Sequence, residues 1–287
     1  MPRRRADDAD ERSSIVDVIG FWSEVKLEIV RKYLPAYTTV LTQQKPRFKT
    51  LYVDAFAGSG HHISKTSGEL VMGSPAIALD TRPPFDEYHF IDLDQAKVAA
   101  LGALAQERSN VFVYHGDSNA ILHQRVFTRA KYEDYRRALC FLDPYNLQLN
   151  WDVVAAAGQM RTVELFLNFP MLAIHRNVLR HDPKTVTKRN VNRMTQFWGD
   201  DSWREVGYRE ALTLFGPTEE KIEGRELAEL YRERLRTVAG FSYVPQPMAM
   251  RNSQGGVVYY LFFCSYNRTG GKIVANIFER FRQKGYR

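Results

Sequence analysis

The sequence predicts a doubly wound α/β sheet, on three observations. Short apolar runs alternate with segments of helical periodicity from about residue 50 to residue 170. The first of these runs ends in a glycine-rich turn, and the first four end in Asp or lead directly into it. Because right-handed crossovers join parallel strands, this alternation predicts a Rossmann-like fold with helices on both faces of the sheet.

The region before this alternation is different in character. Residues 1–13 mix Arg, Asp and Glu without apolar periodicity, which predicts a disordered lead-in to one domain over residues 14–287. From Ile15 to Leu41 the apolar residues recur at helical spacing and predict one or two amphipathic helices that break at Pro35. We expect these helices to pack at the sheet edge or to form a lid.

The remaining elements come in order along the chain. The expected strands are Thr50–Phe56, Tyr88–Asp92, Val111–His115, Ala138–Asp143, Val163–Phe169, Tyr243–Met248 and Val257–Ser265. The expected helices begin near residue 75, with Ser74 as N-cap and Pro75 first in the helix, and then cover Gln95–Gln106, a segment after Asp117, a segment from Trp151, and Lys272–Phe281. Residues 171–240 interrupt the rhythm and predict a mostly helical insertion before the last strands, one of which is expected to be antiparallel.

Composition limits the possible classes of protein. The 287 residues are 44% hydrophobic, enough for a large core, and the net charge of +7 with a pI near 9.3 favours an anionic partner such as nucleic acid. No apolar run approaches the roughly 18 residues that span a bilayer, so we expect a soluble, cytoplasmic protein. Cys140 and Cys264 lie in apolar runs without metal-ligand spacing, which predicts buried reduced thiols and no metal site.

The glycine-rich turn reads Asp54-Ala-Phe56-Ala-Gly58-Ser-Gly60. Gly58 and Gly60 can adopt positive φ and allow the backbone to approach a ligand closely at the end of the first strand. A dinucleotide-binding pattern would need a third glycine where this chain has Ile63, and a helix starting at once. The turn instead resembles motif I of the S-adenosylmethionine (SAM) methyltransferases, and a simple tight turn is the alternative. The long loop 61–73 after the turn could cover a cofactor.

Acidic residues lie at the ends of the second and third strands. Asp92 stands at the end of the second strand, where a carboxylate can accept hydrogen bonds from both ribose hydroxyls of an adenosine cofactor. Asp117 ends the third strand and could accept from an adenine amino group. The alternative for each is a helix cap, which we expect to be the role of Asp94.

The fourth strand leads into Asp143-Pro144-Tyr145-Asn146. This segment resembles the Asp-Pro-Pro-Tyr motif of amino methyltransferases, in which the acidic side chain and a proline carbonyl orient the target amine and the aromatic ring stacks on a flipped base. The chain has one proline where that motif has two. A strand-ending turn without a catalytic role is the alternative.

The predicted insertion carries a basic segment with aromatic neighbours. This combination suits phosphate contacts and base stacking, and the alternative is a solvated helix face with the aromatic rings in the core. The basic residues are Arg176, Arg180, Lys184, Lys188, Arg189 and Arg193, and the aromatic ones are Phe197, Trp198 and Trp203.

Taken in order, these blocks resemble the three-Cys-motif partner protein (TcmP) family, whose members look like SAM-dependent methyltransferases. The resemblance covers roughly residues 20–280. It rests on Lys26-x-Glu28-Ile-Val with Tyr33-Leu34, Tyr52-Val-Asp-Ala-Phe-Ala-Gly-Ser-Gly60, Gly73-Ser-Pro-Ala-Ile-Ala-Leu79, Gly116-Asp117-x-Asn119, Phe141-Leu-Asp-Pro-Tyr145 with Trp151, and Phe197-Trp-Gly-Asp200 with Trp203.

The resemblance implies a class I SAM-dependent methyltransferase fold with SAM as cofactor. It further implies that Asp54, Phe56, Gly58 and Gly60 line the methionine end of SAM, that Asp92 and Asp117 hold the ribose and the adenine, and that Asp143, Pro144 and Tyr145 face the methyl acceptor. By association it implies a radical-SAM-like partner with three closely spaced cysteines, in a bacterial or phage setting.

The leading hypothesis is therefore methyl transfer to a nucleic-acid or nucleotide nitrogen. A methyltransferase-like scaffold that has lost catalysis and binds nucleic acid or its partner is the first alternative. A hydrolase or nuclease that holds Mg²⁺ with Asp92, Asp117 and Asp143 is the second.

Overall fold

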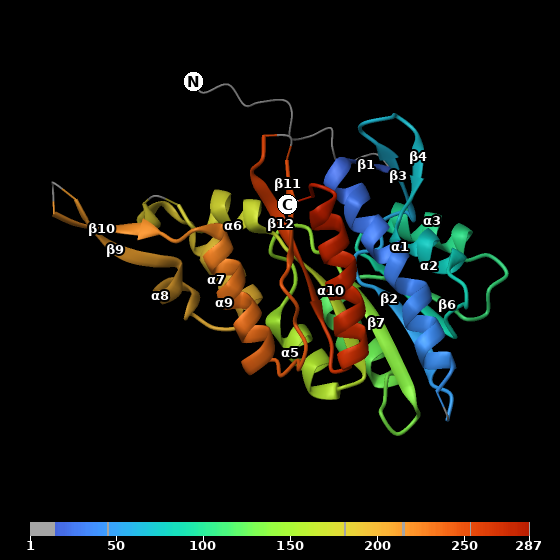
Figure 1. Cartoon of the computed structure of the whole chain (residues 1–287). Coiled ribbons are helices and arrows are strands. Elements are labelled where there is room, and N and C mark those ends of the chain that lie inside the picture. Colours follow the sequence, from blue (N-terminus) through green and yellow to red (C-terminus); the bar gives the residue numbers. More distant parts are fainter. Residues whose placement is uncertain (1–14, 45, 181, 214–215, 253, 287) are drawn as a thin grey trace.

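A seven-stranded sheet forms the centre of the computed structural model (Figure 1), which describes residues 15–44, 46–180, 182–213, 216–252 and 254–286. The lead-in predicted for residues 1–13 lies outside the described residues. The strand order is β11-β12-β8-β7-β2-β5-β6. Its strands are β2 (Lys49–Asp54), β5 (Glu87–Asp92), β6 (Val111–His115), β7 (Arg136–Leu142), β8 (Val163–Phe169), β11 (Met248–Arg251) and β12 (Val257–Cys264).

The sheet is parallel except at one strand. Strands β6, β5, β2, β7 and β8 pair in parallel, whereas β12 is antiparallel to both β8 and β11. The order reverses at β2, because β5 and β6 lie on one side of it and β7 and β8 on the other. This is the doubly wound sheet that the sequence predicts, with the reversed strand near one edge that is typical of class I methyltransferases.

Helices cover both faces of the sheet and two smaller sheets lie outside it (Figure 1). The helices are α1 (Phe21–Thr42), α2 (Ser74–Asp80), α3 (Gln95–Leu104), α4 (Ser118–Ile121), α5 (Trp151–Met160), α6 (Met171–Asn177), α7 (Lys188–Trp198), α8 (Trp203–Gly207), α9 (Gly224–Thr237) and α10 (Arg268–Gln283). Short turns of other helix types come after α4, as η2 (Leu122–Val126) and η3 (Phe127–Arg129), and before α7, as η4 (Pro183–Thr185). The smaller sheets contain β1 (Asp17–Ile19), β3 (His61–Ser64) and β4 (Leu70–Met72), and β9 (Tyr208–Thr213) with β10 (Gly216–Lys221).

Two apolar clusters sandwich the sheet. One contains residues of α1, α2, α3 and α10, and the other contains residues of η2 and of α5 to α9. Strand β2 shows the alternation, since Tyr52 belongs to the first cluster and Leu51 and Val53 to the second. A strand buried on both faces reads as a continuous apolar run, which is why the sequence predicts this strand so directly.

Helix α1 corrects the expected break at Pro35, because it continues through that residue to Thr42. The hydroxyl of Thr38 donates to the carbonyl oxygens of Leu34 and Pro35, both at 3.2 Å. The buried face of α1 packs on β2, α2 and α10, so the helix lies across the sheet and not only at its edge. This burial offsets the cost of an interior proline, about 3 kcal/mol.

Two further expectations need correction. Helix α2 begins at Ser74, so Gly73 is the N-cap and Ser74 is already helical. The last-but-one strand is Met248–Arg251, whereas Tyr243 forms only an isolated bridge with Ser265. The region 171–240 is mostly helical, as predicted, and also contains the paired strands β9 and β10 (Figure 1). Among the described residues no helix combines the length and the apolar character needed to cross a membrane.

Candidate active site

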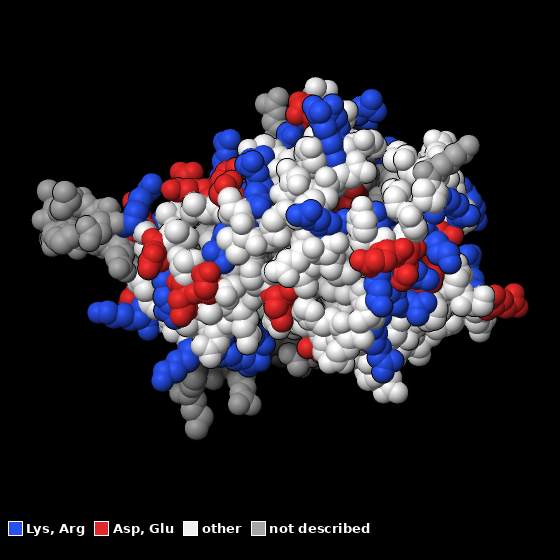
Figure 2. Space-filling view, turned by 90° about the horizontal axis from the view of Figure 1, so that it is seen from below, with Lys and Arg blue, Asp and Glu red and all other residues white. Residues whose placement is uncertain are grey.

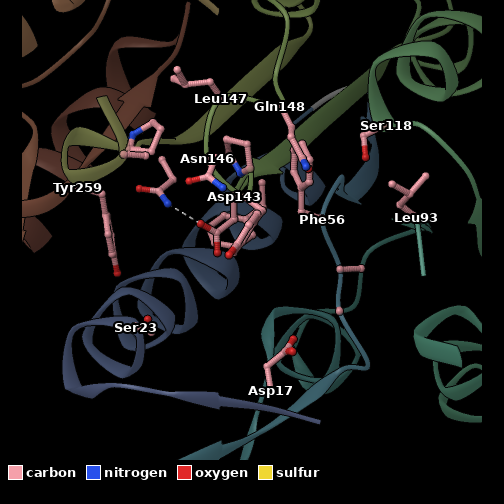
Figure 3. A pocket seen from close by; sticks show the side chains of 18 of the residues that line it. Asp17, Ser23, Phe56, Leu93, Ser118, Asp143, Asn146, Leu147, Gln148 and Tyr259 are labelled. Atoms are coloured by element: carbon pink, nitrogen blue, oxygen red, sulfur yellow. Dashed lines mark hydrogen bonds between the residues drawn. The ribbon is translucent and has the colours of Figure 1, made fainter. Parts of the chain in front are cut away.

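A cleft of about 1110 Å³ opens at the carboxyl ends of the central strands. In doubly wound sheets ligands bind at this edge, beside the strand at which the order reverses. Ser23 on α1 and Tyr259 on β12 lie on one side of the cleft, and Phe56 and Leu93 lie on the other (Figure 3). The cleft has the size of a site for a cofactor together with a small second ligand.

The glycine-rich turn contributes Phe56 and Gly58 to the lining of the cleft. Gly58 has φ of +62°, and its N–H donates to Oδ2 of Asp92 at 2.8 Å. Gly60 has φ of +86° and does not belong to the lining. A Cβ at Gly60 would lie 2.7 Å from Cδ2 of Leu104, so this glycine allows the turn to pack closely on α3.

Asp54 lies beneath the turn and is fully buried, outside the lining of the cleft. Its carboxylate accepts hydrogen bonds from the Tyr52 hydroxyl at 3.3 Å and from the Phe56 N–H at 3.4 Å. Burial raises the pKa of Asp54 to about 7; the Ser74 hydroxyl opposes this rise and Asp143 adds to it. In this position Asp54 stabilises the turn through its hydrogen bond with the Phe56 N–H.

Asp92 ends β5 and lines the cleft. Its two carboxylate oxygens accept from the N–H groups of Gly58 and Asp94, both at 2.8 Å, which fixes the plane of the carboxylate. Each oxygen keeps a further lone pair for a ligand. Asp94 caps α3 by accepting from Ala96 at 2.8 Å and Lys97 at 3.3 Å, which confirms the capping role expected for Asp94.

Asp117 is both a helix cap and a residue of the cleft. It is the N-cap of α4, because its Oδ1 accepts from the backbone N–H of Asn119 at 3.1 Å and from the Asn119 side chain at 3.0 Å. It also lines the cleft, together with Ser118 and Asn119. The carboxyl ends of β5 and β6 therefore both present a carboxylate to the same cleft.

Asp143 is held by two side chains from different elements. Its Oδ2 pairs with Nζ of Lys26 on α1, and its Oδ1 accepts from Nδ2 of Asn168 on β8 at 2.7 Å, the dashed line in Figure 3. Oδ1 of Asn168 is buried and has no hydrogen-bond partner among the described residues. The cleft thus contains an orphaned acceptor beside Asp143.

Lys26 is a residue to which the sequence patterns assigned no role in the site. Its side chain is only 6% exposed and its ammonium lies 5.7 Å from the centroid of the Phe141 ring and 5.2 Å from that of Tyr259. Burial lowers the pKa of Lys26, but the adjacent Asp143 more than offsets this, so that the pKa lies above its ordinary value. The available signal was a lysine between Val25 and Leu27, on the face of α1 that becomes buried.

Pro144 and Tyr145 continue from Asp143 along the wall of the cleft. The Tyr145 side chain is 73% exposed, and Asn146 has φ of +57°, so the chain turns sharply here. The segment is therefore a strand-ending turn whose residues also line the cleft. An aromatic ring this exposed is available for stacking on a ligand.

The basic segment divides into two groups. Arg176 on α6 and Arg193 on α7 line the cleft. The other four basic residues lie outside the lining and are exposed, namely Arg180, Lys184, Lys188 and Arg189.

The neighbouring aromatic residues do not line the cleft. Phe197, Trp198 and Trp203 are 1%, 1% and 3% exposed and belong to the core, where Phe197 and Trp198 pack against Tyr231. Of the two alternatives for these rings, the one that places them in the core is confirmed. They cannot reach a ligand because the buried faces of α7 and α8 place them in the core on one side of the sheet.

Within the described ranges, no three His, Cys, Asp or Glu side chains gather closely enough to hold a metal ion. Asp92, Asp117 and Asp143 lie at the ends of three different strands and do not form such a group, so the arrangement gives no support to the Mg²⁺ alternative. Cys140 and Cys264 are buried free thiols, as expected, and burial raises the pKa of both.

Comparisons with solved structures find proteins with a similar chain path. Trm1 from Pyrococcus horikoshii, solved with S-adenosyl-L-methionine, is 12% identical over 87% of this chain and 57% of its own, with a TM-score of 0.44. Protein LPL1258 from Legionella pneumophila, of family DUF519, is 11% identical over 87% and 90%, with a TM-score of 0.46. An S-adenosylmethionine-dependent methyltransferase from Mesorhizobium loti is 9% identical over 75% and 89%, with a TM-score of 0.35.

These similarities concern the fold alone. No family model matches this chain and no curated protein matches it in sequence, so the likeness to the TcmP family rests on its motifs. The class of protein is defined by the chain itself: strand order, a reversed strand beside β8, and a cleft at the carboxyl ends of β2, β5 and β7 make it a class I methyltransferase-like fold.

Proposed function

We propose that this protein is a SAM-dependent methyltransferase that acts on a nitrogen of a nucleic acid or a nucleotide. The observation that carries the proposal is the arrangement of one cleft, with Asp92 fixed at the end of β5 and Asp143, Pro144 and Tyr145 directly after β7. The cofactor and the acceptor would then occupy neighbouring parts of the same cleft.

The polar groups of the cleft suit the hydrogen-bond donors of SAM. Asp92 would accept from the ribose hydroxyls, because its oxygens keep free lone pairs beside the Gly58 N–H that orients them. Asp117 would accept from the adenine amino group, and Phe56 and Gly58 would line the methionine end. Asp54 and Gly60 would act by shaping the turn. When bound, SAM supplies a methyl group on a sulfonium.

The acceptor side would hold an amino group by its two hydrogens. Asp143 and the Pro144 carbonyl are the acceptors in this proposal, and Tyr145 would stack on the base that carries the amine. Lys26 and Asn168 fix the Asp143 carboxylate from two directions, so that it cannot turn away when the amine arrives. Alignment of the amine with the methyl donor then provides much of the acceleration.

The test is calorimetric titration of SAM into the purified protein, with ATP and NAD as controls. We expect saturable binding that Asp92→Ala abolishes. Asp143→Asn preserves the shape of the side chain, so we expect it to retain SAM binding and to lose transfer of labelled methyl to nucleic-acid and nucleotide acceptors.

Failure of folded wild-type protein to bind SAM would contradict the proposal and favour the catalytically inactive scaffold. Equal loss of SAM binding in both variants would contradict the division of roles between Asp92 and Asp143.

The partner belongs to the same proposal. The motif resemblance to the TcmP family supports a radical-SAM-like protein with three closely spaced cysteines as the functional partner, in a bacterial or phage modification, repair or defence system. Co-expression of the two proteins followed by affinity capture of this chain tests it, and absence of the partner from the captured complex would argue against a stable assembly.

A further inference from the structure

Charged side chains divide the cleft into two parts. Along the carboxyl edge of the sheet, Asp117 comes after β6, Asp92 ends β5 and Asp143 comes after β7. Beyond them, past β8, the lining carries Arg176 and Arg193 instead. The edge of the sheet therefore changes from acidic at β6, β5 and β7 to basic past β8, and this change falls within the proposed acceptor side, beyond Asp143.

The two arginines lie on neighbouring helices, α6 and α7, which are joined by a hydrogen bond. Nδ2 of Asn190, in the first turn of α7, donates to the carbonyl oxygen of Asn177 at the end of α6 at 3.1 Å. Arg176 directly precedes Asn177, and Arg193 lies about one helical turn beyond Asn190. Both side chains face the same cleft.

The two arginines differ from the two lysines of the lining, which are both paired. Lys26 pairs with Asp143, and Lys97 pairs with Asp17 at 2.6 Å. In the part of the chain that the structure describes, no hydrogen bond or ion pair reaches the guanidinium of Arg176 or Arg193.

The two arginines differ in how far they are exposed. Arg193 is half-buried at the wall of the cleft, whereas Arg176 is exposed, so both guanidinium groups are accessible to an anionic ligand from the cleft. Guanidinium groups bind phosphate with two parallel hydrogen bonds, which gives them an advantage over lysine for this ligand.

We propose that Arg176 and Arg193 form a phosphate subsite at the acceptor end of the cleft, so that the methyl acceptor carries a phosphate ester close to the modified base. This inference rests on the proposed function for the identity of the base-binding part. The face seen in Figure 2 mixes Lys and Arg with Asp and Glu, so the positive charge visible there is not gathered into one patch. The shared chemistry is a phosphate ester, from either a free nucleotide or a nucleic-acid strand.

The experiment measures binding of two phosphate probes in the absence of SAM. The first is the set of four nucleoside 5′-monophosphates, each titrated singly, with the matching nucleosides as controls. The second is a fluorescently labelled single-stranded oligonucleotide of mixed sequence, in DNA and RNA forms. The variants are Arg176→Ala and Arg193→Ala, with Arg180→Ala and Arg189→Ala as matched controls from the same segment outside the lining.

We expect each cleft variant to weaken binding of phosphate probes roughly tenfold or more, because a charge-assisted hydrogen bond is lost. The controls should change it less than about twofold, and nucleoside binding should not change. Arg193→Gln repeats the measurement with a side chain of similar polarity if Arg193→Ala unfolds. For the oligonucleotide, each cleft variant should also reduce the slope of log K against log salt by about 0.7.

The outcomes distinguish a free nucleotide from a nucleic-acid strand as the source of the phosphate. They also distinguish failure of the phosphate subsite from failure of the proposed methyltransferase function. Loss confined to the monophosphates assigns the subsite to free nucleotides, and loss with the reduced salt slope assigns it to a strand. Equal weakening in cleft and control variants, nucleosides bound as tightly as nucleotides, or no binding of any phosphate probe would overturn the subsite. Arginine-dependent phosphate binding by a protein that does not bind SAM would leave the subsite intact and overturn only the proposed enzyme.

Discussion

One helix contacts two partly buried acids at opposite ends of the sheet. Lys26 of α1 pairs with Asp143 beyond the carboxyl end of β7, and Tyr33 of the same helix donates to Glu164 near the amino end of β8. We call Lys26, Asp143, Asn168 and Tyr259 the carboxyl-end cluster and Tyr33, Glu164 and Ser265 the amino-end cluster. The two donors of α1 are seven residues apart in sequence, about 10 Å along the helix.

The clusters differ in the kind of partner that they give the acid. Asp143 faces an ammonium group and lines the cleft of about 1110 Å³. Among the described residues, Glu164 has hydrogen-bond partners only in the hydroxyls of Tyr33 and of Ser265, the latter at 2.7 Å, and it lies beside a cavity of about 330 Å³. Burial raises the pKa of Glu164 to about 7, against the effect of the two hydroxyls. The acid in the candidate site thus has a cationic partner, whereas the acid at the amino end has neutral hydroxyl partners.

The largest effect that we predict is for Lys26→Met. This change removes the counter-ion and leaves the Asp143 carboxylate facing a buried apolar side chain. Breaking a fully buried pair from one side typically costs about 3–5 kcal/mol. Because the Asp143 side chain keeps 26% exposure, we expect a smaller loss of about 2–3 kcal/mol in the free energy of unfolding, measured in urea. The variant should also lose any activity that depends on the orientation of Asp143.

A double-mutant cycle with Asp143→Asn is the control for Lys26→Met. The double variant should recover part of the loss, because neither a lone charge nor a broken pair remains. If Lys26→Met alone lowers the free energy of unfolding by less than about 1 kcal/mol, the Lys26–Asp143 pair does not stabilise the fold appreciably. The energetic difference between the two clusters would then be contradicted.

The second prediction concerns Glu164→Gln and depends on pH. In the folded state the pKa of Glu164 is about 7, whereas its ordinary value is 4.5. Below pH 4.5 the acid is protonated in both states and its contribution to stability is fully present. As the pH rises toward 7, the unfolded state releases its proton first, so this contribution is lost, by up to about 3 kcal/mol in total.

Glutamine does not titrate, so Glu164→Gln should be more stable than the wild type at pH 8 by up to this amount and gain nothing at pH 4. Urea unfolding at both values measures it. Asp54, whose pKa is also raised to about 7 by burial, produces a similar decline, so the variant should keep part of the pH dependence. A gain of equal size at both pH values would show that Glu164 does not titrate in this range.

The smallest effect on stability, and a specific effect on binding, is expected for Tyr145→Ala. The ring is 73% exposed, so the free energy of unfolding should change by less than about 0.5 kcal/mol. Stacking on a base contributes about 1–3 kcal/mol, so affinity for single-stranded oligonucleotide should fall correspondingly. The matched control is Tyr132→Ala, a 61% exposed ring outside the lining. An equal loss of affinity in both variants would remove Tyr145 from the acceptor side.

Local sequence pattern was sufficient to place the parallel strands and the acids at their ends, but it misplaced β11. Val111–His115 and Val163–Phe169 are strands with the predicted bounds, and Asp92 and Asp117 lie in one cleft as expected. Both results have the same cause. A parallel strand buried on two faces must be apolar throughout, and parallel strands bring their carboxyl ends to one edge, so local pattern is enough to place the residue at the end of each strand.

The partners of those acids, by contrast, depend on tertiary contacts. Lys26 and Asp143 are 117 residues apart, and no local pattern links α1 to β7. Helix α1 continues through Pro35 because its packing on β2, α2 and α10 outweighs a local preference. Trp198 lies in the core, and Gly60 packs against α3, so neither residue lines the cleft. Each of these outcomes depends on which surfaces meet after folding, and contacts between distant segments leave no signal in the spacing of a single sequence.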